Sequence, residues 1–148
     1  MYISTEAAER IVREVSLAVD RPVNLMNDHG IIIASTDLSR IGTLHQGAYE
    51  SIRDNMDCLI VRSDSDYPGS RIGINIPIRF EGQIAGVVGI RGDAYEELNR
   101  YIRLIRTTAE TLLRESALHP LPSPEAAQDR GRIIGEGYHV RCGEGHAE

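Results

Sequence analysis

Hydrophobic residues recur with helical spacing near both ends of the first 116 residues. In residues 4–19 the apolar positions three and four apart are Ala8, Ile11, Val12, Val15, Ala18 and Val19. This period predicts an amphipathic helix that Ser4 or Thr5 can cap and that ends before Pro22. A second stripe consists of Leu98, Tyr101, Ile102, Ile105, Thr108, Ala109 and Leu112. It predicts one long helix from about Asp93 to Ser116.

Between these helices the apolar positions change to the period of two that is typical of strands. Segments 23–27 and 31–35 flank Asp28-His29-Gly30 and predict a hairpin. Residues 31–33 are all isoleucine and therefore apolar on both faces, which favours an inner strand of the sheet.

A second hairpin is predicted over residues 74–80 and 83–90, with Glu81-Gly82 as its turn. Pro77 has no N–H donor, so its strand is expected to lie at an edge or to carry a bulge there. Residues 58–61 predict a short strand, 37–55 a broken helical segment, and 64–71 a loop.

The order helix, strands, broken helices, strands, helix predicts an α+β fold. We expect a PAS-like or Cache-like antiparallel sheet flanked by N- and C-terminal helices. Residues 1–116 are predicted to form one domain. Residues 117–148 begin with a proline-rich run and continue rich in glycine and polar residues, which predicts a poorly ordered tail.

Composition narrows the function classes. All 16 basic residues of the 148 are arginines, they are interspersed with acids along the chain, and the net charge is −6. Direct nucleic-acid binding by this chain is therefore not expected. No apolar run approaches the roughly 20 residues of a membrane helix, and the N-terminus does not read as a secretory signal. We expect a cytoplasmic location and no membrane partner.

Enzymatic and metal-binding motifs are not found. The sequence has no nucleophile elbow, Walker A loop, zincin motif or dinucleotide-binding fingerprint, so we expect no catalytic residues and no cofactor. His139, Cys142 and His146 offer only three zinc ligands in a glycine-rich segment, so no metal site is predicted. Cys58 and Cys142 form no disulfide framework.

Two blocks carry a family resemblance. The first is N-D-H-G-I-I-I-A-S-T-D-L-S-R-I-G-T-L-H-Q-G-A at 27–48, and it contains R-I-G-x-x-H-x-G. The second is G-I-N-I-P-I at 73–78 and E-G-Q-I-A-G-V-V-G-I at 81–90, followed by T-A-E at 108–110. Over residues 4–116 the chain resembles the sugar-diacid recognition domain, the N-terminal sensor of carbohydrate-diacid transcription regulators.

The resemblance implies a non-catalytic sensor that binds glycerate, glucarate, galactarate or a related small hydroxylated carboxylate. It leads us to expect glycine at 36, glutamate at 46 and a smaller polar residue at 91, where this chain has Thr36, Gln46 and Arg91. These differences could alter ligand preference. No helix-turn-helix segment is predicted after residue 116, so the chain is read as a truncated or standalone sensor, or one that signals through another protein.

Six residues are predicted to bind the ligand: Ser35, Arg40, Gly42, His45, Gly47 and Asn75. A guanidinium can hold a carboxylate in bidentate geometry, and the glycines allow close backbone approach. The amide of Asn75 can donate to and accept from hydroxyls. Each of three residues also has an interpretation without a ligand. Arg40 could be a solvated arginine on a helix, His45 a helix-capping histidine and Asn75 a solvent-facing asparagine. If His45 contacts an anion as a cation, binding should strengthen at mildly acid pH.

A different class of function stays open. The stripe of the 94–116 helix is close to a heptad register, which predicts a homodimer contact. The same stripe could instead pack on the protein's own sheet. The alternative function is thus a dimerisation or protein-interaction module without a small-molecule ligand.

Overall fold

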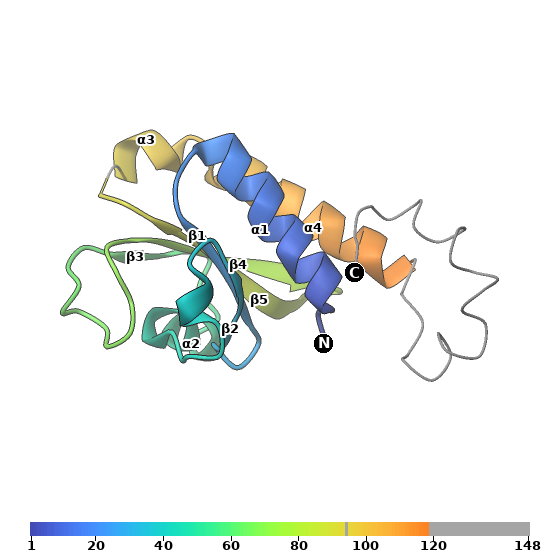
Figure 1. The fold of residues 1–148 in the computed structure, drawn as a ribbon, viewed down its shortest axis with the longest axis horizontal. Helices are drawn as coiled ribbons and strands as arrows, with labels where there is room; N and C mark the ends of the chain where they lie inside the picture. The colour runs from blue at the N-terminus through green and yellow to red at the C-terminus, as the bar shows by residue number, and fades with distance from the viewer. Residues whose placement is uncertain (94, 119–148) are drawn as a thin grey trace.

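The computed structural model describes residues 1–93 and 95–118, and its centre is a five-stranded antiparallel sheet (Figure 1). The strands are β1 (Val23–Asn27), β2 (Ile32–Ser35), β3 (Leu59–Val61), β4 (Gly73–Phe80) and β5 (Gln83–Arg91). Their order across the sheet is β2-β1-β5-β4-β3. The helices are α1 (Thr5–Val19), α2 (Gln46–Arg53), α3 (Tyr95–Asn99) and α4 (Ile102–Leu118), and η1 (Leu38–Arg40) is a 3-10 turn. The predicted α+β fold with an antiparallel sheet is confirmed.

The predicted tail lies almost wholly outside the described residues, because the structure describes nothing beyond Leu118. The same holds for His139, Cys142 and His146. In residues 1–93 and 95–118, no group of three or more histidine, cysteine, aspartate or glutamate side chains is placed to hold a metal ion. The helices of this part include none that is long and apolar enough to cross a membrane.

The main core lies between one face of the sheet and the helix pair α1 and α4, which run side by side (Figure 1). Ser4 caps α1 as predicted, since its Oγ accepts from the Ala7 N–H at 3.1 Å. The apolar face of α1 buries Ile11 and Val15 against the sheet. Alternate residues of β4 point to this side, so its isoleucines at 74, 76 and 78 are buried here.

The opposite face of the sheet is covered by α2 and carries a second, smaller core. Met26, Ile32, Ala48 and Val87 form it, with Ile52 packed against them. This cluster covers only part of the face. Strand residues that alternate with those of the main core also point to the α2 side of the sheet. Outside the small cluster, some of these residues are polar.

The interpretation of residues 31–33 as part of an inner strand is wrong, because β2 is an edge strand. Its apolar residues are covered from two sides: Ile32 belongs to the small core under α2, and Ile33 packs against the main core. The outer edge of β2 is covered by residues 42–45. The Ile32 N–H donates to the Thr43 carbonyl at 2.9 Å, and the Gly42 N–H donates to the Ile32 carbonyl at 2.8 Å. Covering an edge in this way protects it from pairing with other chains.

The expectation that Pro77 marks an edge strand is wrong, because β4 lies between β5 and β3. β3 pairs with β4 only along Gly73–Asn75, so Pro77 has no strand partner on that side. The pairing of β4 with β5 also shifts register between Ile78 and Arg79. The irregularity thus lies close to Pro77, between the next two residues, and not at the proline itself.

The prediction of one continuous helix from Asp93 to Ser116 is wrong, because α3 and α4 are separate. The chain turns after Asn99, where the Tyr101 N–H donates to the Leu98 carbonyl at 2.8 Å. The turn lets α3 lie across the end of the sheet while α4 follows α1, and Leu98 and Ile105 are both buried in the main core. Tyr101, predicted to lie in the apolar stripe, is 44% exposed.

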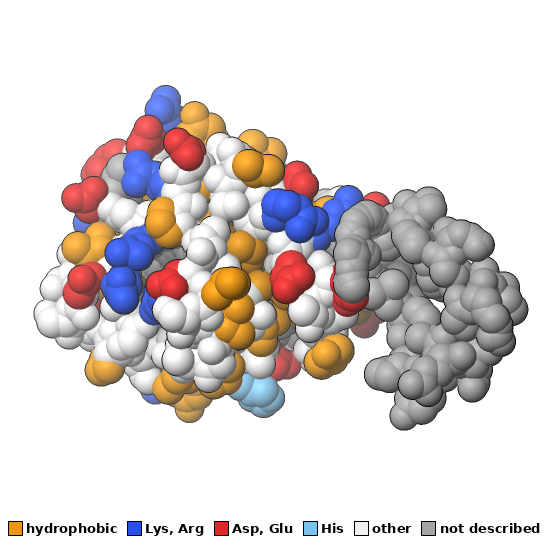
Figure 2. Space-filling model, viewed as in Figure 1, with side chains coloured by type: hydrophobic (Ala, Val, Ile, Leu, Met, Phe, Trp, Pro, Cys, Tyr) orange, Lys and Arg blue, Asp and Glu red, His pale blue; other side chains and the backbone are white. Residues whose placement is uncertain are grey.

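The outer surface of the helix pair mixes hydrophobic and charged side chains (Figure 2). Ion pairs between Arg10 and Glu115 at 2.7 Å and between Arg21 and Glu97 at 2.8 Å show that the chain from α3 to α4 runs antiparallel to α1. Leu17 near the end of α1 therefore lies level with the start of α4, where Leu104 is found. These two leucines are 74% and 61% exposed.

Candidate ligand-binding site

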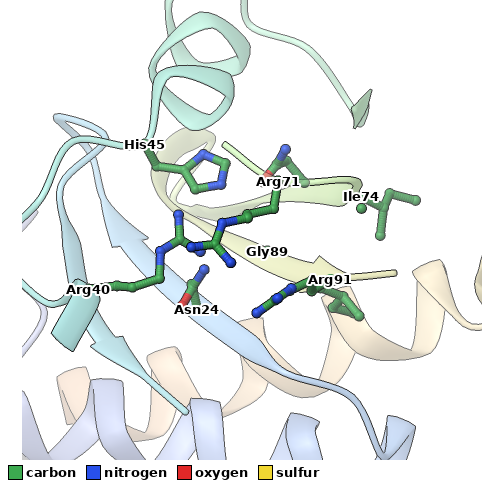
Figure 3. A pocket seen from close by; sticks show the side chains of 10 residues that line it. Asn24, Arg40, His45, Arg71, Ile74, Gly89 and Arg91 are labelled. Carbon is green, nitrogen blue, oxygen red and sulfur yellow. The ribbon is translucent and has the colours of Figure 1, made fainter. Parts of the chain in front are cut away.

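A small hollow with about 10 Å³ of free volume opens on the α2 side of the sheet (Figure 3). Strands β1, β4 and β5 form its floor, while η1, the start of α2 and the chain before β4 form its walls. The residues that line it are Asn24, Arg40, His45, Arg71, Gly73, Ile74, Asn75, Gly89, Ile90 and Arg91. The lining contains three arginines and no acidic residue.

The floor is a row of three residues on neighbouring strands. Asn24 of β1 is paired with Gly89 of β5, which is paired with Asn75 of β4. A Cβ on Gly89 would lie 3.1 Å from Oδ1 of Asn75 and 3.1 Å from Cε of Met26, tighter than most real contacts. The glycine therefore leaves room for the two amides on either side of it.

The amide of Asn24 is oriented by β2. Its Oδ1 accepts a short hydrogen bond from the Ser35 hydroxyl, which in turn accepts from the Asp37 N–H at 2.9 Å. With its oxygen held by Ser35, Asn24 points its amide nitrogen toward the arginine heads (Figure 3). Ser35 thus acts on the hollow through Asn24 and does not line it.

His45 joins the hollow to α2. Its side chain is buried and caps the helix, because Nδ1 accepts from the Ala48 N–H at 3.1 Å and lies 3.1 Å from the Ser70 hydroxyl. A backbone N–H can only donate, so Nδ1 must accept and the ring proton lies on Nε2. Burial, reinforced by the Arg40 charge, lowers the pKa of His45 to about 4. His45 is therefore a neutral donor at neutral and mildly acid pH, not the cation on which the predicted pH dependence rested.

Three guanidinium groups converge over the floor (Figure 3). Arg40 comes from η1, Arg71 from the chain before β4 and Arg91 from the end of β5. Burial lowers the pKa of Arg40, and the charges of Arg71 and Arg91 lower it further. Nη2 of Arg40 donates to the Gly69 carbonyl at 2.6 Å, which holds that side chain in place. Mutual repulsion among the three cations makes the hollow a site at which an anion is favoured.

The structure brings three of the six predicted residues, Arg40, His45 and Asn75, into the lining of the hollow. Gly47 lies directly behind them: a Cβ there would come within 3.2 Å of Nδ2 of Asn75, so only glycine fits without displacing neighbours. Gly42 does not line the hollow. It has φ of 92°, with open space around its Cα, and serves the turn that brings residues 42–45 along β2. Ligand contact by the six residues stays a prediction.

The sequence analysis did not select Asn24, Arg71 or Gly89. Asn24 had a usable signal, because it alternates with apolar Val23 and Leu25 in the way that Asn75 alternates with its neighbours. Arg71 follows a loop and carries no periodic signal. Arg91 had been noted only as a departure from the family pattern.

The sequence comparisons decide the family. The family model described as "Putative sugar diacid recognition" matches residues 3–123. The chain belongs to the sugar diacid recognition family. The carbohydrate diacid regulator of Escherichia coli (strain K12) is 37% identical over 121 residues, which cover 79% of this chain and 30% of the regulator. An uncharacterised protein of Haemophilus influenzae is 32% identical over 123 residues, covering 80% of this chain and 32% of that protein. This sugar diacid recognition chain thus spans about a third of the length of the curated relatives it matches.

Solved structures support the fold of this family member. The GAF domain of an Acinetobacter phosphoenolpyruvate-protein phosphotransferase aligns with a TM-score of 0.57 at 9% identity, over 75% of this chain and 82% of that domain. The type II free methionine-R-sulfoxide reductase of Thermoplasma acidophilum aligns with a TM-score of 0.51 at 17% identity, over 74% and 96%. At these identities the likeness concerns the fold alone, and it agrees with the predicted PAS-like class.

Proposed function

We propose that this sugar diacid recognition chain binds a small hydroxylated carboxylate, such as glycerate, glucarate or galactarate, as the sensor part of a cytoplasmic transcription regulator. The observation that carries the proposal is the hollow itself, where three guanidinium groups meet two amides and a neutral imidazole with no acid in the lining. The name of the Escherichia coli relative, a carbohydrate diacid regulator, agrees with it.

Each group in the hollow suits one part of such a ligand. A carboxylate accepts from the planar guanidinium of Arg40 in a charge-assisted, bidentate geometry. The Nε2–H of His45 donates to a carboxylate or hydroxyl oxygen. The amides of Asn24 and Asn75 match hydroxyls, which both donate and accept. The site therefore favours hydroxy acids over plain carboxylic acids.

We also propose that the site performs no catalysis, although Ser70 and His45 form a buried serine–histidine pair. Nδ1 of His45 already accepts from the Ala48 N–H, and the Ser70 hydroxyl accepts from the Gly47 N–H at 2.8 Å. Ser70 is 3% exposed, which keeps its oxygen from reaching a substrate carbonyl. The pair fixes the start of α2, and Ser70 is not activated as a nucleophile.

The test is a thermal-melt and calorimetric screen of the purified chain with glycerate, tartrate, glucarate, galactarate and acetate. A ligand at about 100 times its dissociation constant should stabilise the fold by about 2.7 kcal/mol, a shift of several degrees. The shift should disappear in Arg40→Ala and persist in Arg114→Ala, which removes an exposed arginine on α4. Equal shifts with acetate and the hydroxy acids, or an unchanged response in Arg40→Ala, would contradict the proposal.

Self-association through the helix pair is a second candidate, favoured by the exposed Leu17 and Leu104. We propose that this surface pairs two copies of the chain. Sedimentation should then give a dimer that Leu104→Glu converts to a monomer, while the exposed Leu38→Glu leaves it unchanged. A dimer in a protein that responds to no acid would favour the interaction module over the sensor.

A further inference from the structure

The positive charge of the hollow exceeds what a single carboxylate would offset. Three segments of the chain each contribute one arginine to it, and the charges of Arg71 and Arg91 lower the pKa of Arg40. Within residues 1–93 and 95–118, neither Arg71 nor Arg91 uses its side chain in a hydrogen bond or ion pair, whereas Arg40 is held by the Gly69 carbonyl. Two complete guanidinium groups therefore remain for a ligand in addition to Arg40.

The arginines are also concentrated in one place. Their heads converge above Asn24 within the same small hollow (Figure 3). A long sugar diacid carries its two charges at opposite ends of the molecule and would suit cations at two separate points. The arrangement seen here suits a short ligand whose negative charges lie close together.

A phosphoryl group meets this requirement better than a second carboxylate. As a monoester it carries about −1.5 to −2 charges at neutral pH on three acceptor oxygens, and guanidinium groups match its geometry. A short hydroxy acid that bears one phosphoryl group has a total charge of about −2.5 to −3. That charge balances the three arginines of the lining.

Building on the proposed function, we infer that the preferred ligand is a short hydroxy acid that carries a phosphoryl group, of the phosphoglycerate class. Arg71 and Arg91 hold the phosphoryl oxygens. Arg40 and the Nε2–H of His45 hold the carboxylate, and the amides of Asn24 and Asn75 meet the remaining hydroxyl.

The test is calorimetry of the full chain at constant ionic strength with 2-phosphoglycerate, 3-phosphoglycerate, glycerate, glucarate and inorganic phosphate. At least one phosphoglycerate should bind about tenfold or more tightly than glycerate and glucarate, since charge-assisted hydrogen bonds are added. Arg91→Gln should reduce this preference to within about threefold, because it weakens phosphoglycerate binding by more than glycerate binding. Arg114→Gln, the matched control on α4, should keep the full preference.

The pH dependence gives a second readout. The second pKa of a phosphomonoester is about 6, so its affinity should fall as the pH is lowered from about 7.5 to about 5.5, while that of glycerate stays constant. His45, with a pKa of about 4, stays neutral in this range, and the other polar groups that face the ligand are arginines and amides.

The outcomes separate the two proposals. If glycerate or glucarate binds as tightly as the phosphoglycerates, or if inorganic phosphate alone matches them, this inference is overturned and the proposed function is judged on its own screen. If none of the acids binds, both fail.

Discussion

The burial of His45 should make the protein sensitive to acid well above the pH at which carboxylates titrate. Its pKa is about 4 in the folded protein, against 6.5 as the ordinary value. Between these values the unfolded chain binds the imidazole proton and the folded protein does not, so stability is full above pH 6.5 and falls as the pH drops toward 4. The whole difference corresponds to about 3 kcal/mol, of which about 2 kcal/mol falls between pH 7 and pH 5. For a domain of this size that lowers the melting temperature by roughly 5–10 °C.

The assay is urea unfolding of the unliganded protein followed by far-ultraviolet circular dichroism at pH 7 and pH 5. The informative variant is His45→Asn, because asparagine can still cap α2 but does not titrate. The loss of stability between the two pH values should be smaller in this variant by about 2 kcal/mol. His29→Asn, which removes an imidazole that is 82% exposed, is the matched control and should behave like the parent protein. An identical pH dependence in His45→Asn and the parent would refute the burial argument.

Three further predictions concern the hollow. Affinity for glycerate or another carboxylate should vary by less than about twofold between pH 5.5 and pH 8 in calorimetric titrations. The reason is that the pKa of His45 in the unliganded protein is about 4. A tenfold gain in affinity toward acid pH would mean that the imidazole becomes charged. Arg71→Gln should raise the free energy of unfolding of the unliganded protein slightly, by about 0.5 kcal/mol, because it relieves repulsion on Arg40. The same variant should weaken ligand-induced stabilisation in thermal melts. Gly89→Ala should reduce ligand affinity by about tenfold in the same titrations, because the added Cβ lies 3.1 Å from Oδ1 of Asn75 and displaces that amide. An unchanged affinity would mean that Asn75 does not contact the ligand.

Local hydrophobic patterns predicted most helices and strands, because the spacing of apolar residues shows which side of a segment is buried. The stripe of α1 and the alternation in β4 and β5 gave the correct type of structure and nearly correct bounds. The same kind of pattern misplaced β2, since residues 31–33 are covered on both faces by helices although the strand lies at an edge. It also missed the turn after Asn99, because Leu98 and Ile105 are two helical turns apart and remain in phase across it.

The site was only partly predictable for a different reason. Arg40, His45 and Asn75 lie in short segments that carry the family resemblance, so the sequence pointed to them directly. The row of Asn24, Gly89 and Asn75 exists only because β5 lies between β1 and β4, and strand order is not a local property. Arg71 reaches the hollow from an irregular segment, for which no periodic pattern predicts the direction of a side chain.

The segment over residues 42–45 joins the hollow to the edge of β2. It supplies the amide and carbonyl groups that cover the edge of β2, and it leads directly from Arg40 to His45. A substitution that detaches this segment would expose an unpaired strand edge to other molecules and would also open the hollow. A mutational survey that scores only the loss of response to the ligand would then not distinguish variants that self-associate from variants that no longer bind the ligand. Ligands that keep residues 42–45 in place should act as pharmacological chaperones, and dialysing them away should hasten precipitation of weakened variants.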